Sequence, residues 1–115
     1  MLVNVKYGIE VTGGADGTLI EDNVIDGVLA GYTGGAIQDG GYGILLHSAA
    51  EGVVENIGII NNTIRNSTYI GMWIEGENIT MRNNVIVNNL FNFRYGAGDR
   101  YNDLDTSNKV NGEPI

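Results

Sequence analysis

A six-residue pattern, Ile/Met-x-x-Asn-x-Ile, occurs three times in the chain, at residues 20–25, 59–64 and 81–86. Each copy follows a shorter segment that begins with glycine and continues with mostly apolar residues. These shorter segments lie at residues 8–11, 43–46 and 71–74. Paired repeats in a constant order are typical of stacked architectures, in which each repeat contacts only its neighbours. This pattern constrains the possible fold more strongly than any other feature of the sequence.

The asparagine of the pattern gives the length of one repeat. Asn23 and Asn62 are 39 residues apart, whereas Asn62 and Asn84 are 22 residues apart. We take 22 residues as the uninterrupted repeat, so the first interval carries 17 additional residues, the difference between 39 and 22. Two inserts are predicted to hold them, a glycine-rich one at 28–41 and another at 49–56.

Apolar residues alternate with other residues inside each repeat, which is typical of β-strands. The alternation predicts two strand walls that point apolar side chains inward. The first wall contributes Ile9, Val11, Ile44, Leu46, Met72 and Ile74, and the second contributes Ile20, Ile25, Ile59, Ile64, Met81 and Ile86. On the outer side, Asp26 and Arg65 are expected to form an exposed ion pair.

The repeat asparagines are predicted to form a ladder, which would comprise Asn23, Asn62 and Asn84. They would lie at the bend between strands, where Asn tolerates left-handed backbone angles. Stacked side-chain amides can also hydrogen-bond to one another and to buried backbone groups. We therefore expect a structural role for these asparagines.

Short strands at a constant repeat length predict an all-β fold, a short parallel β-helix of about three to four coils over residues 1–90. Residues 91–115 are predicted to form an irregular C-terminal tail that caps the stack or links it to another segment. Three coils would leave unpaired strand edges at both ends. A homo-oligomer, or pairing with the remainder of a longer β-helix, is therefore a further possibility.

The Gly-Ile-x-Leu type strands, Ile59-x-x-Asn62-x-Ile64 and its two sister copies resemble the right-handed parallel β-helix repeats of the pectate-lyase-like superfamily. More narrowly, they resemble the carbohydrate-binding and sugar-hydrolase repeat domain of NosD-like proteins, common in archaeal surface proteins. The segment from Asp105 to Ile115 is similar to the Asp-Thr-Ser-Asn-x-Val-Asn-Gly-Lys-Pro segment that follows such repeats. The resemblance covers roughly residues 7–90 and implies a right-handed β-helix. It leaves the activity open, because the superfamily holds lyases, hydrolases, epimerases and inert scaffolds.

Charge and composition exclude several classes of partner. The formal net charge is −8, with 6 Lys plus Arg against 14 Asp plus Glu, so nucleic acid, which needs a basic surface, is not an expected partner. No apolar run approaches the ~20 residues of a membrane helix, and membrane insertion is not expected. There is no cysteine for a disulfide or a thiolate metal site. An extracellular or cell-surface location is expected if the chain is a segment of a longer exported protein.

Two outward columns of the first wall carry the candidate catalytic residues. One column contains Glu10, and the next places His47 beside Glu75, with column neighbours ~4.8 Å apart. A neutral imidazole beside a carboxylate would make an acid–base pair. An enzyme built on these residues would be a polysaccharide lyase or a glycoside hydrolase. The alternative is that His47 is a surface or hydrogen-bonded structural residue.

The candidate ligand-binding residues lie on the same wall. Trp73, the single Trp of the chain, could stack its indole on a sugar ring. Leu45, Tyr42 and Asp39 are predicted to complete this surface. The alternative is that Trp73 packs beneath an insert as part of a local core.

An acidic segment near the C-terminus is the one candidate metal site, and no other cofactor is expected. Oxygen atoms are the ligands that calcium prefers. The possible calcium ligands are Asp99, Asn102, Asp103 and Asp105. A solvated acidic loop is the alternative.

Taken together, these residues predict a carbohydrate-binding or carbohydrate-processing β-helix module, with a carbohydrate polymer held on the outer strand wall. Whether such a module is an enzyme stays open. One alternative is a non-catalytic structural or adhesive segment of a larger surface protein. The other is a trimeric segment like those of phage fibres.

Overall fold

The computed structural model describes residues 2–3, 7–28, 41–48, 52–95 and 102–114. These residues form β-strands and no helix, so they include no helix that could cross a membrane. The strands are β1 (Leu2–Val3), β2 (Tyr7–Thr12), β3 (Leu19–Glu21), β4 (Val24–Asp26), β5 (Tyr42–His47), β6 (Gly58–Ile60), β7 (Thr63–Arg65), β8 (Ile70–Ile74), β9 (Thr80–Arg82), β10 (Val85–Val87), β11 (Phe91–Tyr95), β12 (Asp103–Leu104), β13 (Lys109–Val110) and β14 (Glu113–Pro114).

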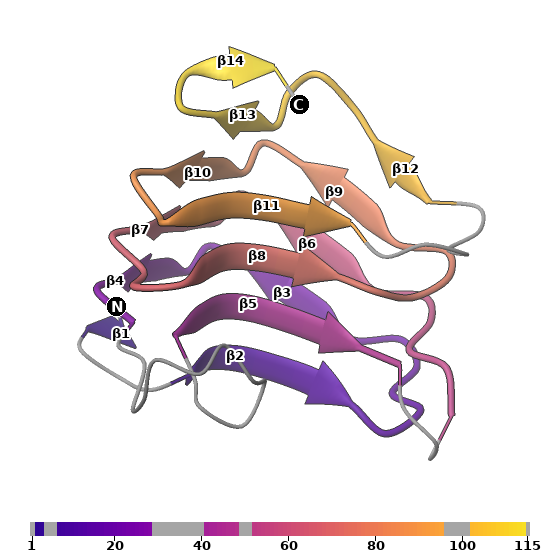
Figure 1. Cartoon of the computed structure of the whole chain (residues 1–115). Coiled ribbons are helices and arrows are strands. Elements are labelled where there is room, and N and C mark those ends of the chain that lie inside the picture. Colours follow the sequence, from indigo (N-terminus) through magenta and orange to yellow (C-terminus); the bar gives the residue numbers. More distant parts are fainter. Residues whose placement is uncertain (1, 4–6, 29–40, 49–51, 96–101, 115) are drawn as a thin grey trace.

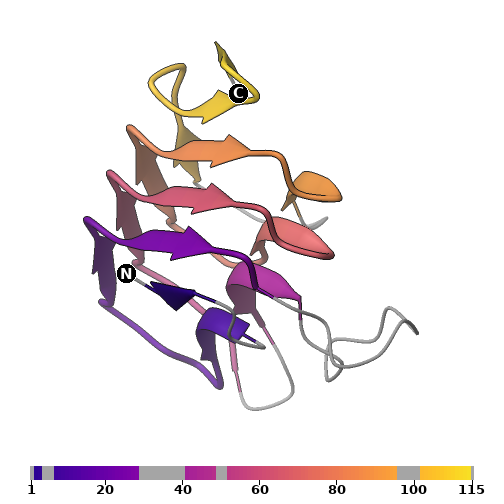
Figure 2. The same cartoon turned by 90° about the vertical axis from the view of Figure 1, so that its left-hand side faces the viewer.

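The strands form three sheets (Figures 1 and 2). Sheet I has the order β11-β8-β5-β2, sheet II has the order β12-β9-β6-β3, and sheet III has the order β1-β4-β7-β10-β13-β14. From β2 to β10, each strand pairs in parallel with the strand three positions later in the chain. The all-β fold with parallel sheets is thus confirmed, and its topology is compatible with a parallel β-helix.

The pairing register agrees with the predicted columns of side chains. Glu10 lies opposite Leu45, and Leu45 lies opposite Trp73. Thr12 lies opposite His47 in the neighbouring column. The 22-residue repeat and the alternation of side chains were therefore sufficient to align strands that are far apart in the sequence.

The main core joins buried apolar residues from all three sheets. Ile44 of β5, Ile59 of β6 and Ile64 of β7 are fully buried in one cluster. The prediction that Ile59 and Ile64 share one wall was wrong, because the chain bends between them and they belong to sheets II and III. Each six-residue repeat therefore supplies two short strands and the corner that connects them.

An asparagine ladder occupies this corner, as predicted. The Oδ1 atom of Asn62 accepts hydrogen bonds from the backbone N and the Nδ2 of Asn23, both at 3.0 Å. Asn84 accepts in the same way from Asn62, at 2.9 and 3.1 Å. A fourth member, Asn108, accepts from Asn84 at 3.2 and 2.8 Å. Asn62, Asn84 and Asn108 are fully buried.

Left-handed backbone angles fall one position earlier than predicted. The residues with positive φ are Asp22 (59°), Asn61 (58°) and Asn83 (56°), each directly before a ladder asparagine. Asn and Asp adopt this conformation at lower cost than other residues with a Cβ. The corner therefore uses neighbouring residues for two tasks, one for the backbone turn and one for the side-chain ladder.

Three stacked glycines allow close approach of the backbone in sheet I. A Cβ at Gly8 would overlap the carbonyl oxygen of Gly43, and a Cβ at Gly43 would overlap that of Gly71. A Cβ at Gly71 would lie 2.7 Å from the carbonyl oxygen of Asn92. This close packing explains the glycine that begins each of the shorter sequence segments.

The second predicted insert, 49–56, is shorter than expected. Glu55 forms isolated parallel bridges with Asp16 and with Glu77, so this part of the segment continues the stack between β5 and β6. Residues 49–51 lie outside the described residues. Of the first predicted insert, Val28 is fully buried, and residues 29–40 lie outside the described part of the chain.

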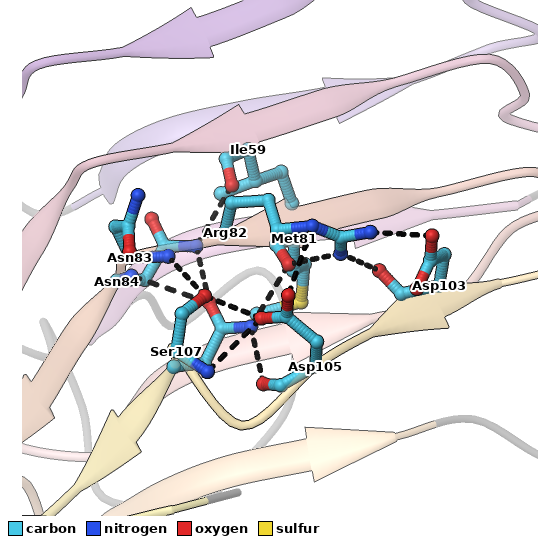
Figure 3. Close-up of polar contacts among 9 residues, drawn as sticks. Ile59, Met81, Arg82, Asn83, Asn84, Asp103, Asp105 and Ser107 are labelled. Atoms are coloured by element: carbon cyan, nitrogen blue, oxygen red, sulfur yellow. Dashed lines mark hydrogen bonds and ion pairs between the residues drawn. The ribbon is translucent and has the colours of Figure 1, made fainter.

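The described residues of the C-terminal segment form four short strands, in contrast to the predicted irregular tail. Its strands β11, β12 and β13 add to sheets I, II and III in turn, and β14 pairs antiparallel with β13. Figure 3 shows how side chains anchor this segment, since Arg82 of β9 hydrogen-bonds to Asp103 and forms a second ion pair with Asp105. Ser107 in turn donates to Asp105 and accepts from the backbone N of Asn83.

Candidate functional site

The outer side of sheet I brings together His47, at the end of β5, and Glu75, directly after β8. Their Nδ1 and Oε2 atoms are 2.8 Å apart, and both side chains are partly buried. Since a carboxylate oxygen accepts, the Nδ1 atom of His47 is the donor in this contact. The predicted adjacency is present, whereas an acid–base role for the pair stays a prediction.

Glu10 does not join this pair. It is exposed and belongs to the neighbouring column, in which it lies opposite Leu45. In the described part of the chain, no hydrogen bond or ion pair links Glu10 to His47 or to Glu75. The three predicted catalytic residues therefore do not form one cluster of contacting side chains.

Two of the predicted ligand-binding residues, Leu45 and Tyr42, are fully buried. Together with Ile70 they form a second apolar cluster outside sheet I, against which Tyr69 and Trp73 pack. The prediction that Leu45 and Tyr42 offer surface to a ligand was therefore wrong. Strand alternation identified the outer side of the sheet correctly, but it cannot indicate whether that side is covered.

Trp73 is also less available than predicted. The guanidinium carbon of Arg94, the next residue in its column, lies 4.2 Å from the centroid of the indole ring. The ring of Tyr42 lies 5.8 Å away and that of His47 lies 6.0 Å away. The indole Nε1 is buried and has no hydrogen-bond partner among the described residues. This environment favours the alternative in which Trp73 belongs to a local apolar cluster.

A pocket of about 260 Å³ opens next to this cluster, between β8 and β11. It is lined by Tyr69, Ile70, Phe91, Phe93 and Arg94. Ile70 is buried, whereas Phe91 is 55% exposed, and the rings of Tyr69 and Phe91 meet edge to face at 5.8 Å. The accessible aromatic surface is therefore one strand further along sheet I than predicted.

This pocket was not predicted, because residues 91–115 were expected to form a tail outside the coils. The alternating aromatic residues Phe91, Phe93 and Tyr95 are a signal for a further strand. Arg94 lies between two of them, and it forms no ion pair or side-chain hydrogen bond with another described residue. Its N–H donors are thus available at the rim of the pocket.

The predicted calcium ligands have other partners in the structure. Asp103 and Asp105 pair with Arg82, and hydrogen bonds from Ser107 hold the pKa of Asp105 below its ordinary value of 3.8 (Figure 3). Asn102 donates to the carbonyl oxygen of Gly76 and accepts from the backbone N of Ile79. The described residues contain no group of three side chains suited to a metal ion. Two further predicted residues, Asp39 and Asp99, lie outside the described part.

Comparisons with known proteins leave the family of this chain open. No family model matches it, and neither a curated protein nor a solved structure matches it. The likeness of its repeats to those of NosD-like proteins therefore stays a prediction. Within the part of the chain that the structure describes, the candidate groups are the aromatic pocket with Arg94 in its lining and the pair of His47 and Glu75.

Proposed function

We propose that this chain is a short right-handed parallel β-helix whose outer aromatic surface binds a carbohydrate polymer. The strand order supports the β-helix, because the chain visits sheets I, II and III in turn and then returns to sheet I one strand further along. Parallel strands joined by a crossover in the same sheet are right-handed in the great majority of proteins. The likeness of the repeats to NosD-like carbohydrate-binding repeats supports the same proposal.

The pocket beside Phe91 is the observation that carries the carbohydrate-binding proposal. A sugar ring has one apolar face, which stacks favourably on an aromatic ring, and a rim of hydroxyl groups that need polar partners. Phe91 and Tyr69 offer the aromatic surface, and Arg94 offers hydrogen-bond donors beside it. The pocket lies next to the apolar cluster outside sheet I.

Replacement of the exposed aromatic side chain tests this proposal. We expect Phe91→Ala to weaken binding of the preferred oligosaccharide about tenfold, since loss of a stacking contact costs roughly 0.5–1.5 kcal/mol beyond lost area. Binding would be measured by calorimetric titration against a panel of neutral polysaccharides and their oligomers. The matched control is Leu19→Ala, which removes an apolar side chain that is 60% exposed on sheet II.

Two results would contradict the proposal. The first is a parent protein that binds none of the carbohydrates in the panel. The second is a Phe91→Ala variant that binds as tightly as the Leu19→Ala variant, which would place any binding surface elsewhere.

A non-catalytic structural segment is the second candidate function. The complete burial of Leu45 and Tyr42 favours it, because the outer wall of sheet I is then partly a packed layer and not a ligand surface. Absence of binding across the panel, with a parent protein that is folded, would support this candidate.

A further inference from the structure

We infer that the pocket beside Phe91 selects sugars that carry an N-acetyl group. This inference rests on the proposed carbohydrate-binding function and adds the class of sugar. It follows from the mismatch between the mostly apolar lining of the pocket and the many hydroxyl groups of an ordinary hexose.

The lining of the pocket offers few partners for hydroxyl groups. Ile70 is buried, and Phe91 presents only carbon surface. A hydroxyl group placed against them would lose its hydrogen bonds with water and gain none in return, which is costly. A methyl group at the same place is favourable, since it removes apolar surface from water. The acetamido group of an N-acetylhexosamine supplies such a methyl group.

The guanidinium of Arg94 in the lining requires a hydrogen-bond acceptor on the ligand. A guanidinium has N–H donors and no acceptor, and Arg94 has no carboxylate partner among the described residues. Its stacking on Trp73, with 4.2 Å between the guanidinium carbon and the ring centroid, leaves the N–H groups at its edge free to donate. The carbonyl oxygen of an acetamido group is a suitable acceptor, and the Tyr69 hydroxyl can accept from the acetamido N–H.

The net charge of the protein favours a neutral substituent on the sugar. The volume of the pocket favours a single sugar unit. A carboxylate would also pair with Arg94, but the net charge of −8 opposes the approach of an acidic polymer. The acetamido carbonyl offers an acceptor without net charge. The volume of about 260 Å³ is smaller than the roughly 300–1,000 Å³ typical of pockets for drug-sized ligands. The pocket therefore suits one unit of a polymer.

Matched pairs of sugars test the inference. Each pair consists of the methyl glycosides of a hexose and of its 2-acetamido counterpart, in the gluco and galacto configurations. We expect the acetamido sugar of one pair to bind about tenfold more tightly or better, because a hydrogen bond to a charged donor and a buried methyl group together exceed the free energy of a tenfold change. Titration is followed through the emission of Trp73, the single Trp of the chain, because Arg94 stacks on its ring.

A variant of Arg94 tests whether the preference for the acetamido sugar arises at this pocket. Arg94→Met keeps a long apolar side chain but removes the donors, so we expect the preference for the acetamido sugar to fall to less than threefold. Arg65→Met is the matched control, since Arg65 forms a partly buried ion pair with Asp26 on sheet III, and it should retain the preference.

The outcomes separate the two proposals. If hexose and acetamido sugars bind equally and Phe91→Ala weakens both, the N-acetyl inference is wrong and the carbohydrate-binding proposal stands. A preference that persists unchanged in Arg94→Met also overturns the inference. If neither sugar of any pair binds, and no polysaccharide of the panel binds, both proposals fail together.

Discussion

At the scale of single residues, asparagine has two different structural uses in this chain, and they fall on adjacent positions. Asn61 and Asn83 adopt positive φ and turn the backbone, whereas Asn62 and Asn84 point their amides into the ladder. Each ladder amide also donates to a backbone carbonyl, as Asn84 does to Ile59 at 2.7 Å. The ladder thus satisfies buried polar groups that the corner would otherwise leave without partners.

We expect Asn84→Ala to lower the free energy of unfolding by roughly 2–4 kcal/mol, because it removes a buried acceptor that two buried N–H groups share. Those groups are the backbone N and the Nδ2 of Asn62. The matched control is Asn23→Ala at the end of the ladder. Asn23 is half-buried and donates to Asn62, so its loss should cost less than ~1.5 kcal/mol.

Urea denaturation of the two variants would measure both costs on the same scale. Equal destabilisation by Asn84→Ala and Asn23→Ala would contradict the idea that the buried acceptor is the important group.

At the scale of the elements, sheet I depends on a column of glycines that lets three strands approach closely. A Cβ at Gly43 would overlap both the Cγ2 of Ile64 and the carbonyl oxygen of Gly71. Neither group is at the free end of a flexible surface side chain, because Ile64 is fully buried and Gly71 is backbone. The column therefore sets the distance between the beginning of sheet I and the core side chains of sheet III.

Gly43→Ala should destabilise the protein by roughly 1–3 kcal/mol through overpacking. Gly58→Ala is the comparison, because its added Cβ would meet the Cδ1 of Leu19 at 3.0 Å, and Leu19 is an exposed side chain that can move. We expect that second change to stay within about 0.5 kcal/mol of the parent. Thermal unfolding of both variants checks the difference, and similar melting temperatures would argue against a packing role for Gly43.

The strands also show which parts of the structure could be predicted from the sequence. The repeats at 20–25, 59–64 and 81–86 were sufficient for the strands, the register and the ladder, because side-chain alternation and one asparagine fix them locally. The next copy was missed since it reads Leu104-x-x-x-Asn108-x-Val110, with one additional residue before its asparagine. Without that copy, residues 91–110 had no place in the sheets.

The candidate site was harder to predict than the strands. The pairing of His47 with Glu75 follows from register alone, and it was predicted. The burial of Leu45 depends on what packs outside the sheet, which alternation does not encode. The pocket beside Phe91 requires β11 to pair with β8. That pairing was not predicted, because the repeat copy at residues 104–110 was not recognised.

At the scale of the whole molecule, two opposing electrostatic effects should shape the dependence of stability on pH. The net charge of −8 at pH 7 produces self-repulsion that weakens as carboxylates take up protons. Two carboxylates oppose this trend. Hydrogen bonds from Asn66 and then Arg65 lower the pKa of Asp26 below 3.8 in the folded state, and hydrogen bonds from Ser107 do the same for Asp105.

A carboxylate whose folded-state pKa is lowered stabilises the protein fully above its unfolded pKa, and this contribution disappears as the pH falls through the folded value. We therefore expect the melting temperature to stay level or rise slightly from pH 7 towards the ordinary carboxylate pKa of 3.8, and to fall at lower pH. Asp105→Asn should melt lower than the parent at pH 7 and show a smaller acid-induced loss, because the contribution of that carboxylate is already absent. The control is Asp22→Asn, at an exposed position in a left-handed turn that Asn also tolerates. The melting temperature of this variant should fall as steeply as that of the parent below pH 3.8. An acid limb of equal steepness in Asp105→Asn and the parent would mean that the hydrogen bonds from Ser107 to the Asp105 carboxylate do not stabilise the fold.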